Sequence, residues 1–193
     1  GMHGLNPRLA GLDGKVIGLF ASFKEHWVHI LDEVGSQLQA RYSGVTLKRF
    51  QYTKDLNSYT QVAELAKDPE VLPEFKEWIR ECDAVIVANA DAGSCTLYLA
   101  YNAAIVEVLG KPGLLTIQTE FMPLARSALR LRGFPGMRMV DIGIHDISME
   151  PDLSEWIQHI FPERVRAVLD QIVAALTDPL TSEEQNPGSL QEI

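Results

Sequence analysis

Apolar residues recur along the chain in two alternating patterns. Short apolar runs, of which 16–20 and 84–88 are the clearest, have the length and composition of buried strands. Between such runs, apolar residues such as Trp27, Ile30 and Leu31 recur at steps of three and four, which is typical of amphipathic helices. The predicted strands cover 16–20, 45–50, 84–88, 114–117 and 137–144. The predicted helices cover 27–38, 73–81, 97–109, 122–131 and 162–176.

The alternation of strands and helices predicts the fold class. Strand–helix–strand connections cross over a sheet, so that successive strands run parallel and helices cover both faces. We therefore expect an α/β fold, a three-layer, doubly wound, mostly parallel five-stranded sheet of the flavodoxin-like or Rossmann-like kind. The uncharged run 84–89 should be a central strand of this sheet. Such sheets bind ligands beyond the carboxyl ends of their strands, so the segments that follow strands are the places to search.

Length and composition indicate one globular domain. The chain has 193 residues, 46% of them hydrophobic, and a formal net charge of −9. We expect an N-terminal arm at 1–12 that begins with a tag scar, a single domain at 13–180, and a flexible acidic tail at 181–193. The acidic charge disfavours nucleic-acid binding, and no apolar run reaches the roughly 18 residues of a membrane span. Two cysteines, Cys82 and Cys95, make no disulfide framework, so the expected compartment is a reducing cytoplasm.

The turn after the first predicted strand argues against common nucleotide cofactors. Residues 21–26 contain no glycine, whereas dinucleotide-binding and Walker loops need glycines for close approach to phosphates. Ser22 is the only hydroxyl there, so the hydroxyl-rich phosphate loop of flavodoxins is missing as well. We expect no NAD, ATP or FMN at this turn, and no cofactor is assigned. His26 and His29 lie three residues apart, but no carboxylate or thiol completes a metal set, so no metal is expected.

The segment 89–96 is the most informative part of the chain. It joins the most apolar strand to a helix that is apolar nearly all round, and it holds Asp91, Ser94, Cys95 and Thr96. Backbone N–H groups at a helix start favour negative charge, so they stabilise a thiolate at Cys95 or hold a small anionic substrate. The alternative is structural: a hydroxyl caps the helix and the cysteine is a small buried hydrophobe. The residues alone leave both interpretations open.

Other polar residues follow the later strands and should face the same edge of the sheet. Glu120 is a candidate general base, and His145 is a candidate partner that activates the cysteine thiol. Ser22, Gly93 and Thr119 complete the predicted set, in which Gly93 would let a ligand approach the backbone closely. Each polar residue has a plain alternative, because solvated loop residues of these types are common.

The segment resembles a bacterial family that is named for a U-G-S-C motif. In that motif, selenocysteine or cysteine stands three residues before a second cysteine; here the corresponding residues are Ala92, Gly93, Ser94 and Cys95. The surrounding strand, the helix that ends in Gly110-Lys111-Pro112 and the following strand resemble the family as well. The resemblance implies thiol- or selenol-dependent chemistry on a substrate that it does not identify.

This chain departs from the family pattern at the first motif position, where Ala92 stands. A disulfide of the C-x-x-C type with Cys95 is therefore impossible. Cys82 cannot replace the missing thiol, because a strand of about seven residues separates it from Cys95 by roughly 20 Å.

Two functions remain open from the sequence. The first is a thiol-dependent enzyme, either an oxidoreductase or a lyase or isomerase, that acts on a small anionic molecule through Cys95 with Asp91, Glu120 and His145. The second is a non-catalytic binding or sensor module that kept the anion pocket. The apolar helix after Gly93 also leaves a homodimer open.

Overall fold

The computed structural model describes residues 1–21, 25–50, 69–145, 147 and 152–188. Five strands form one sheet in the order β2-β1-β3-β4-β5, and every neighbouring pair is parallel. The strands are β1 (Val16–Ala21), β2 (Thr46–Arg49), β3 (Ala84–Ala90), β4 (Gly113–Ile117) and β5 (Arg138–Val140). The predicted α/β, doubly wound parallel sheet is confirmed, and β3 is its central strand.

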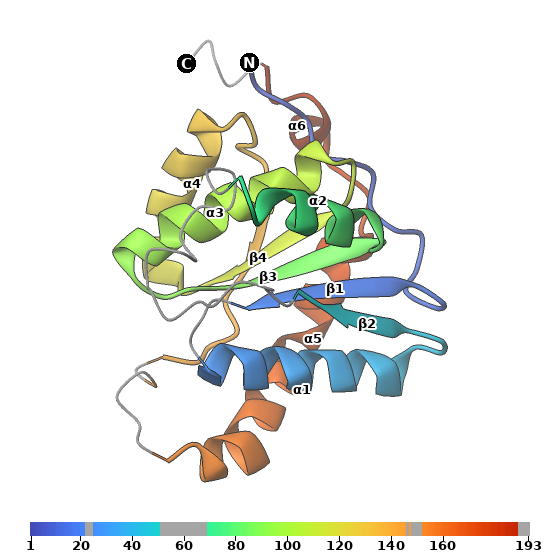
Figure 1. Cartoon of the computed structure of the whole chain (residues 1–193), viewed down its shortest axis with the longest axis vertical. Helices are drawn as coiled ribbons and strands as arrows, with labels where there is room; N and C mark the ends of the chain where they lie inside the picture. The colour runs from blue at the N-terminus through green and yellow to red at the C-terminus, as the bar shows by residue number, and fades with distance from the viewer. Residues whose placement is uncertain (22–24, 51–68, 146, 148–151, 189–193) are drawn as a thin grey trace.

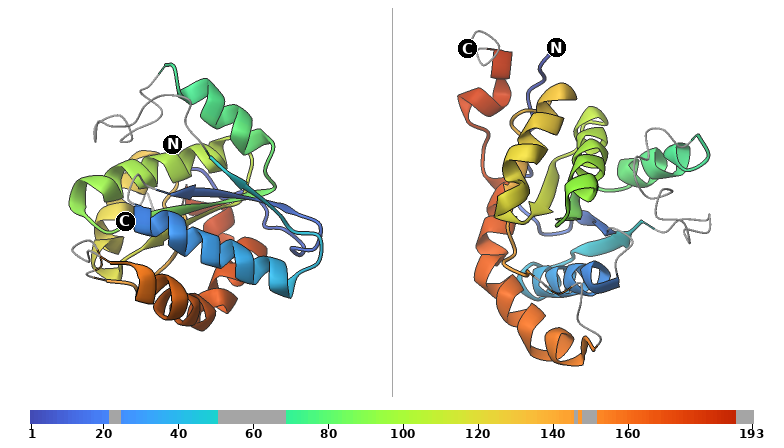
Figure 2. Two further views of the ribbon diagram at one scale, coloured as in Figure 1. Left: turned by 60° about the horizontal axis from the view of Figure 1, so that its bottom comes forward. Right: turned by 90° about the vertical axis from the view of Figure 1, so that its left-hand side faces the viewer.

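Helices cover both faces of the sheet, which gives three layers (Figures 1 and 2). The helices α2 (Leu72–Arg80), α3 (Gly93–Val108) and α4 (Met122–Leu131) lie on one face. On the other face lie α1 (Glu25–Arg41) and α5 (Phe161–Thr177), which pack against each other. Because all five strands run parallel, the segments that follow them all leave the sheet at its carboxyl edge.

Strand β3 is buried along its whole length because both of its faces are covered. Val85 and Val87 belong to the hydrophobic cluster under α2, α3 and α4, whereas Ile86 and Ala88 belong to the cluster under α1 and α5. The side chains of a strand point alternately to opposite faces, so one apolar run can supply both clusters. This position explains why the strand is a continuous apolar run in the sequence.

Two elements differ from their predicted bounds. The last strand is predicted over 137–144, but β5 ends at Val140. There the carboxylate of Asp141 accepts a hydrogen bond from the amide of Gly143 at 2.7 Å, and Gly143 has a φ of 80°, so the chain turns away from β4. Helix α3 begins at Gly93 rather than near 97, because the amide and the hydroxyl of Thr96 both bond to the carbonyl oxygen of Ala92.

The helical segments outside the main layers are short. They are η3 (Thr119–Phe121), a π-helical turn η4 (Trp156–Ile160) that leads into α5, and α6 (Ser182–Gln185). Helix α6 lies within the segment expected to be a flexible tail, and it carries a capping box between Thr181 and Glu184. No helix among the described residues has the length and apolar character needed to cross a membrane.

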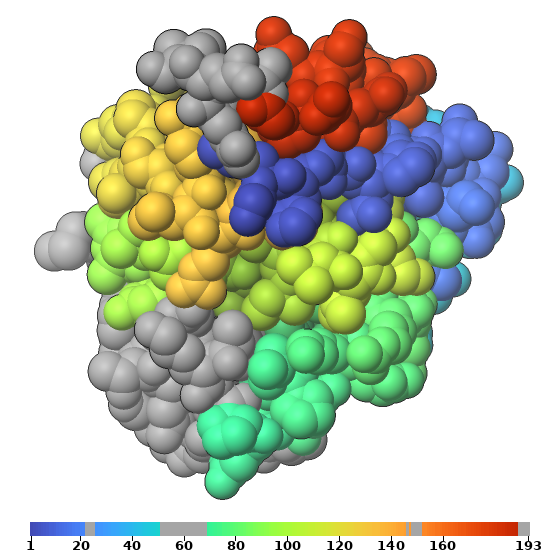
Figure 3. Space-filling model, turned by 90° about the horizontal axis from the view of Figure 1, so that it is seen from above, coloured from blue at the N-terminus to red at the C-terminus, as the bar shows by residue number. Residues whose placement is uncertain are grey.

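The N-terminal arm is tied to the amino edge of the sheet. Arg8 forms an ion pair with Glu107, and the two side chains are 1% and 0% exposed. Glu107 also accepts hydrogen bonds from the backbone amides of Asn6 at 2.9 Å and Gly113 at 2.5 Å. Figure 3 shows the N-terminal arm in blue between α6 in red and the yellow-green end of α3. The arm is thereby fixed to α3 and to the start of β4.

Candidate functional site

The carboxyl edge of the sheet brings together most of the predicted site residues. Because β3, β4 and β5 are neighbours in that order, the segments that follow them lie side by side. Asp91 and the first turn of α3 follow β3, Thr119 and Glu120 follow β4, and His145 lies in the segment after β5. Ser22, the candidate after β1, lies outside the described residues.

The first turn of α3 presents backbone amides to this edge. Ala92 caps the helix with an extended backbone, and its cap has no side-chain hydrogen bond. The amide of Thr96 makes the first bond of the i to i−4 ladder, so the amides of Gly93 and Ser94 stand before that ladder begins. Both residues are exposed, and a Cβ atom added at Gly93 would meet no atom within 4 Å. A ligand can therefore approach the backbone at Gly93.

Cys95 lies in the same turn but points inward. Its residue is only 5% exposed, and it belongs to the hydrophobic cluster under α2, α3 and α4. The adjacent Thr96 is fully buried, and its hydroxyl donates a 2.7 Å hydrogen bond to the carbonyl oxygen of Ala92. Of the two predicted hydroxyl ligands in this turn, only that of Ser94 is on an exposed residue.

Asp91 is held at the end of β3 by residues of α1. The indole nitrogen of Trp27 donates a 2.8 Å hydrogen bond to its Oδ2 atom. The Nε2 atom of His26 lies 3.9 Å from the same oxygen. His26 is only 7% exposed, and within the described part of the chain its Nε2 atom has no hydrogen-bond partner. A buried carboxylate and a buried imidazole therefore meet beside the first turn of α3.

Asp141 connects the segments that follow β4 and β5. Its Oδ2 atom accepts hydrogen bonds from the amide and the hydroxyl of Thr119, at 2.9 and 2.7 Å. Its Oδ1 atom accepts the amide of Gly143 at 2.7 Å and lies 3.3 Å from Nε2 of His145. Burial alone would raise the pKa of Asp141, but the hydrogen bonds from Thr119, Gly143 and His145 together hold that pKa below its ordinary value. Asp141 is therefore a carboxylate at neutral pH.

Three residues at this edge are not found by sequence reasoning. The helical spacing of Trp27 predicts packing only, the spacing of His26 suggests a metal ligand only, and Asp141 falls inside a predicted strand. The sequence signal for Asp141 is the Asp-Ile-Gly triplet at 141–143, in which an aspartate precedes a glycine by two residues as in many turns. Glu120 is exposed in η3, at the same edge of the sheet.

The two cysteines are at opposite ends of β3. Cys82 precedes the strand and Cys95 follows it, and both are free thiols. Burial raises the pKa of Cys82 to about 12, and its Sγ atom donates to the carbonyl oxygen of Trp78 at 3.2 Å. Among the described residues, no three His, Cys, Asp or Glu side chains are grouped to hold a metal ion.

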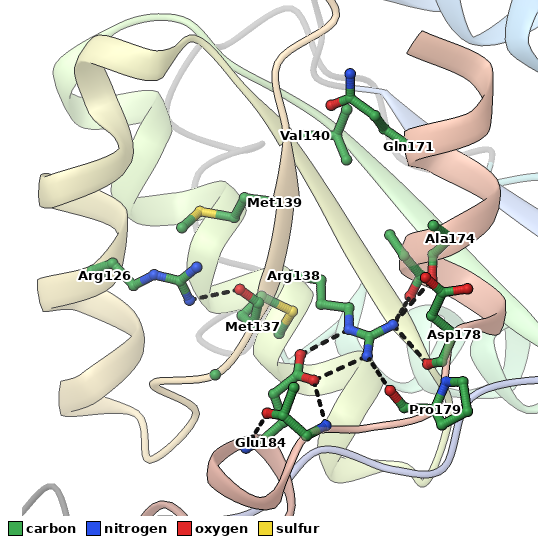
Figure 4. Close-up of a pocket in the computed structure, with 13 residues that line it drawn as sticks. Arg126, Met137, Arg138, Met139, Val140, Gln171, Ala174, Asp178, Pro179 and Glu184 are labelled. Carbon is green, nitrogen blue, oxygen red and sulfur yellow. Dashed lines mark hydrogen bonds and ion pairs between the residues drawn. The ribbon is translucent and has the colours of Figure 1, made fainter.

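A groove of about 550 Å³ lies elsewhere, along the edge strand β5 between α4 and α5 (Figure 4). Its most prominent side chain is Arg138, which forms a bidentate ion pair with Glu184 at 2.8 and 2.9 Å. Arg138 also donates to the backbone carbonyls of Ala174 and Asp178 at the end of α5. Its charge is thus used in joining α6 and α5 to the sheet, and none of the predicted site residues lines this groove.

Comparison with known proteins identifies the family. The profile of the UGSC family matches residues 2–178, which is most of the chain. The chain belongs to the UGSC family. The resemblance seen around 92–95 therefore extends over a UGSC-family domain that includes the N-terminal arm and α5. The comparison with curated proteins gives no match.

Two solved structures resemble the fold of this UGSC-family chain. An oxidoreductase from Corynebacterium diphtheriae has 11% sequence identity and a TM-score of 0.46, and the alignment covers 86% of this chain and 98% of that one. One of the polypeptides of dipicolinate synthase from Bacillus halodurans has 13% identity and a TM-score of 0.42, with coverage of 90% and 97%. At this distance, neither activity transfers to the UGSC-family chain.

Proposed function

We propose that this protein is a thiol-dependent enzyme that binds a small anionic molecule at the first turn of α3. The observation that carries the proposal is the position of Cys95 in the same helical turn as the exposed Gly93 and Ser94. The amides of that turn favour a bound carboxylate or phosphate, and they favour the thiolate over the thiol at Cys95. One helix start thus supplies both the binding group and the reactive group.

The chemistry that fits best uses one thiol. Cys82 and Cys95 are separated by the length of β3, and Ala92 offers no second thiol in the motif. A lyase or isomerase in which the Cys95 thiolate acts as base or nucleophile needs one sulfur only, whereas an oxidoreductase needs a partner thiol or an external electron acceptor. Asp91 and His145 are the candidate groups for accompanying proton transfers, and Glu120 is a further one on the same edge.

The second candidate function is a non-catalytic binding or sensor module. Its support is the burial of Cys95, which is 5% exposed among apolar side chains, as an inert structural cysteine would be. In this case the first turn of α3 still binds an anion, but the thiol takes no part.

Alkylation of Cys95 tests both functions. In the Cys82→Ser variant Cys95 is the only thiol, and its rates with iodoacetate and iodoacetamide are compared near neutral pH with those of 2-mercaptoethanol. The enzyme proposal expects alkylation of Cys95, with the anionic reagent favoured more than it is by the free thiol. Slow alkylation combined with stabilisation of the fold by inorganic phosphate supports the module. Slow alkylation without any effect of phosphate overturns both functions.

A further inference from the structure

The contacts of Asp141 are not explained by the anion site alone. This one carboxylate binds the amide and hydroxyl of Thr119, the amide of Gly143 and the imidazole of His145. We propose that His145 is a proton-transferring residue toward the ligand held at the first turn of α3, and that Asp141 is its positioning residue. This inference rests on the proposed function and adds to it the group that moves the proton.

The geometry fixes which nitrogen of His145 carries out the transfer. Oδ1 of Asp141 lies 3.3 Å from Nε2, so the ionised carboxylate favours the tautomer in which Nε2 carries the hydrogen. The lone pair is then on Nδ1, which takes a proton from the ligand and gives an imidazolium, while Asp141 stays ionised. The side chain of His145 is 43% exposed, so a ligand at the carboxyl edge can reach the ring.

The hydrogen bonds of Asp141 also give the dyad a fixed position in the fold. Oδ2 is occupied by two groups of Thr119, which lies just after β4, so the carboxylate cannot rotate freely. Because β4 lies between β3 and β5, Thr119 stands between the first turn of α3 and the segment that holds His145. A single carboxylate thus sets the distance of the imidazole from the neighbouring helix start.

The ring nitrogens of His145 provide a readout that does not depend on turnover. The full chain is labelled with ¹⁵N, and the spectra of its five histidines are assigned with the His145→Gln variant. The ratio of the Nε2–H to the Nδ1–H tautomer of His145 is measured in the wild type and in Asp141→Asn. We expect the substitution to lower this ratio by about tenfold, because a hydrogen bond to a charged acceptor is lost.

A matched control is Asp152→Asn, in a second carboxylate that accepts an amide and a hydroxyl, both from Ser154. It should leave the His145 ratio unchanged. Thr119→Val, which removes one of the two bonds to Oδ2, should change the ratio less than Asp141→Asn does. An unchanged ratio in Asp141→Asn overturns the positioning role. If Asp141→Asn does not fold, the Thr119→Val ratio decides, and equality with the wild type overturns it.

Inorganic phosphate separates this inference from the proposed function. Phosphate should slow the alkylation of Cys95 and shift the ring signals of His145 together, and both effects should be absent in Gly93→Val. If phosphate slows the alkylation but leaves the His145 signals unmoved, His145 is not at the ligand and only the inference fails. If phosphate changes neither, the proposed anion site fails.

Discussion

The indole of Trp27 on α1 donates a 2.8 Å hydrogen bond to Asp91 at the end of β3. The two residues are 64 positions apart in the chain, yet this bond fixes the carboxylate that directly precedes the capping residue Ala92 of α3. Trp27 itself is 1% exposed, so a core side chain orients a polar group of the candidate site. Packing and site geometry therefore meet in this pair.

Replacing Trp27 by Phe should lower the free energy of unfolding by about 2–3 kcal/mol, because it removes a hydrogen bond to a buried carboxylate together with part of a buried ring. Trp78→Phe is the matched control, since Nε1 of Trp78 is buried without a hydrogen-bond partner among the described residues. Chemical denaturation of both variants measures the difference. Equal losses would show that the bond to Asp91 contributes nothing.

Gly93→Val should abolish the effect of phosphate on Cys95 while leaving the fold nearly as stable as the wild type. A Cβ atom at Gly93 meets open space, so the side chain fits, but it covers the amides of the first turn of α3. Phosphate titrations followed by thermal unfolding and by alkylation rate measure both parts. Phosphate binding that survives the substitution would place the anion site elsewhere.

The ion pair of Arg138 and Glu184 predicts a loss of stability in acid. The hydrogen bond from Arg138 lowers the pKa of Glu184 from 4.5 to about 2. A carboxyl whose pKa is depressed in the folded state stabilises that state above its unfolded pKa, and this contribution disappears as the pH falls from about 4.5 to about 2. Glu184→Gln, which can keep the capping box with Thr181, tests this. The variant should be less stable than the wild type by on the order of 2 kcal/mol at pH 7, and equally stable near pH 2. A difference that does not change with pH would contradict the assignment.

Arg8→Met should destabilise the protein by about 3 kcal/mol or more, because Glu107 remains buried as a charge without its ionic partner. Arg41→Met removes a more exposed ion pair, with Asp170, and should be close to neutral. Urea denaturation of the two variants compares them. Arg8→Met with wild-type stability would mean that the N-terminal arm detaches at no cost.

Much of the fold follows from periodicity alone. The run 84–88 is β-branched and uncharged because its two faces contribute to two clusters, and this pattern predicts a central strand. The strand after α4 is predicted too long, since Ile142 and Ile144 are apolar and buried but lie in an irregular segment. Apolar alternation reports burial, and it cannot distinguish a strand from a coil that packs against the same core.

The candidate site is predictable only where the fold itself determines neighbours. The order of elements places 91–96, Thr119 and His145 at one edge, in keeping with the sheet topology. The partners of these residues are not predictable, because Trp27 and Asp91 meet only through the packing of α1 against β3. Asp141 likewise becomes a bridge only when the chain leaves β5 and turns at Gly143.

The two edges of the sheet carry different duties. The buried pairs Arg8–Glu107 and Arg138–Glu184 lie at the start of β4 and β5, whereas the exposed Gly93, Ser94 and Glu120 lie beyond the ends of the strands. Substitutions among those exposed residues therefore remove few native contacts. A lineage with this architecture can explore new ligand chemistry at one edge while its thermodynamic reserve, held at the other, stays intact.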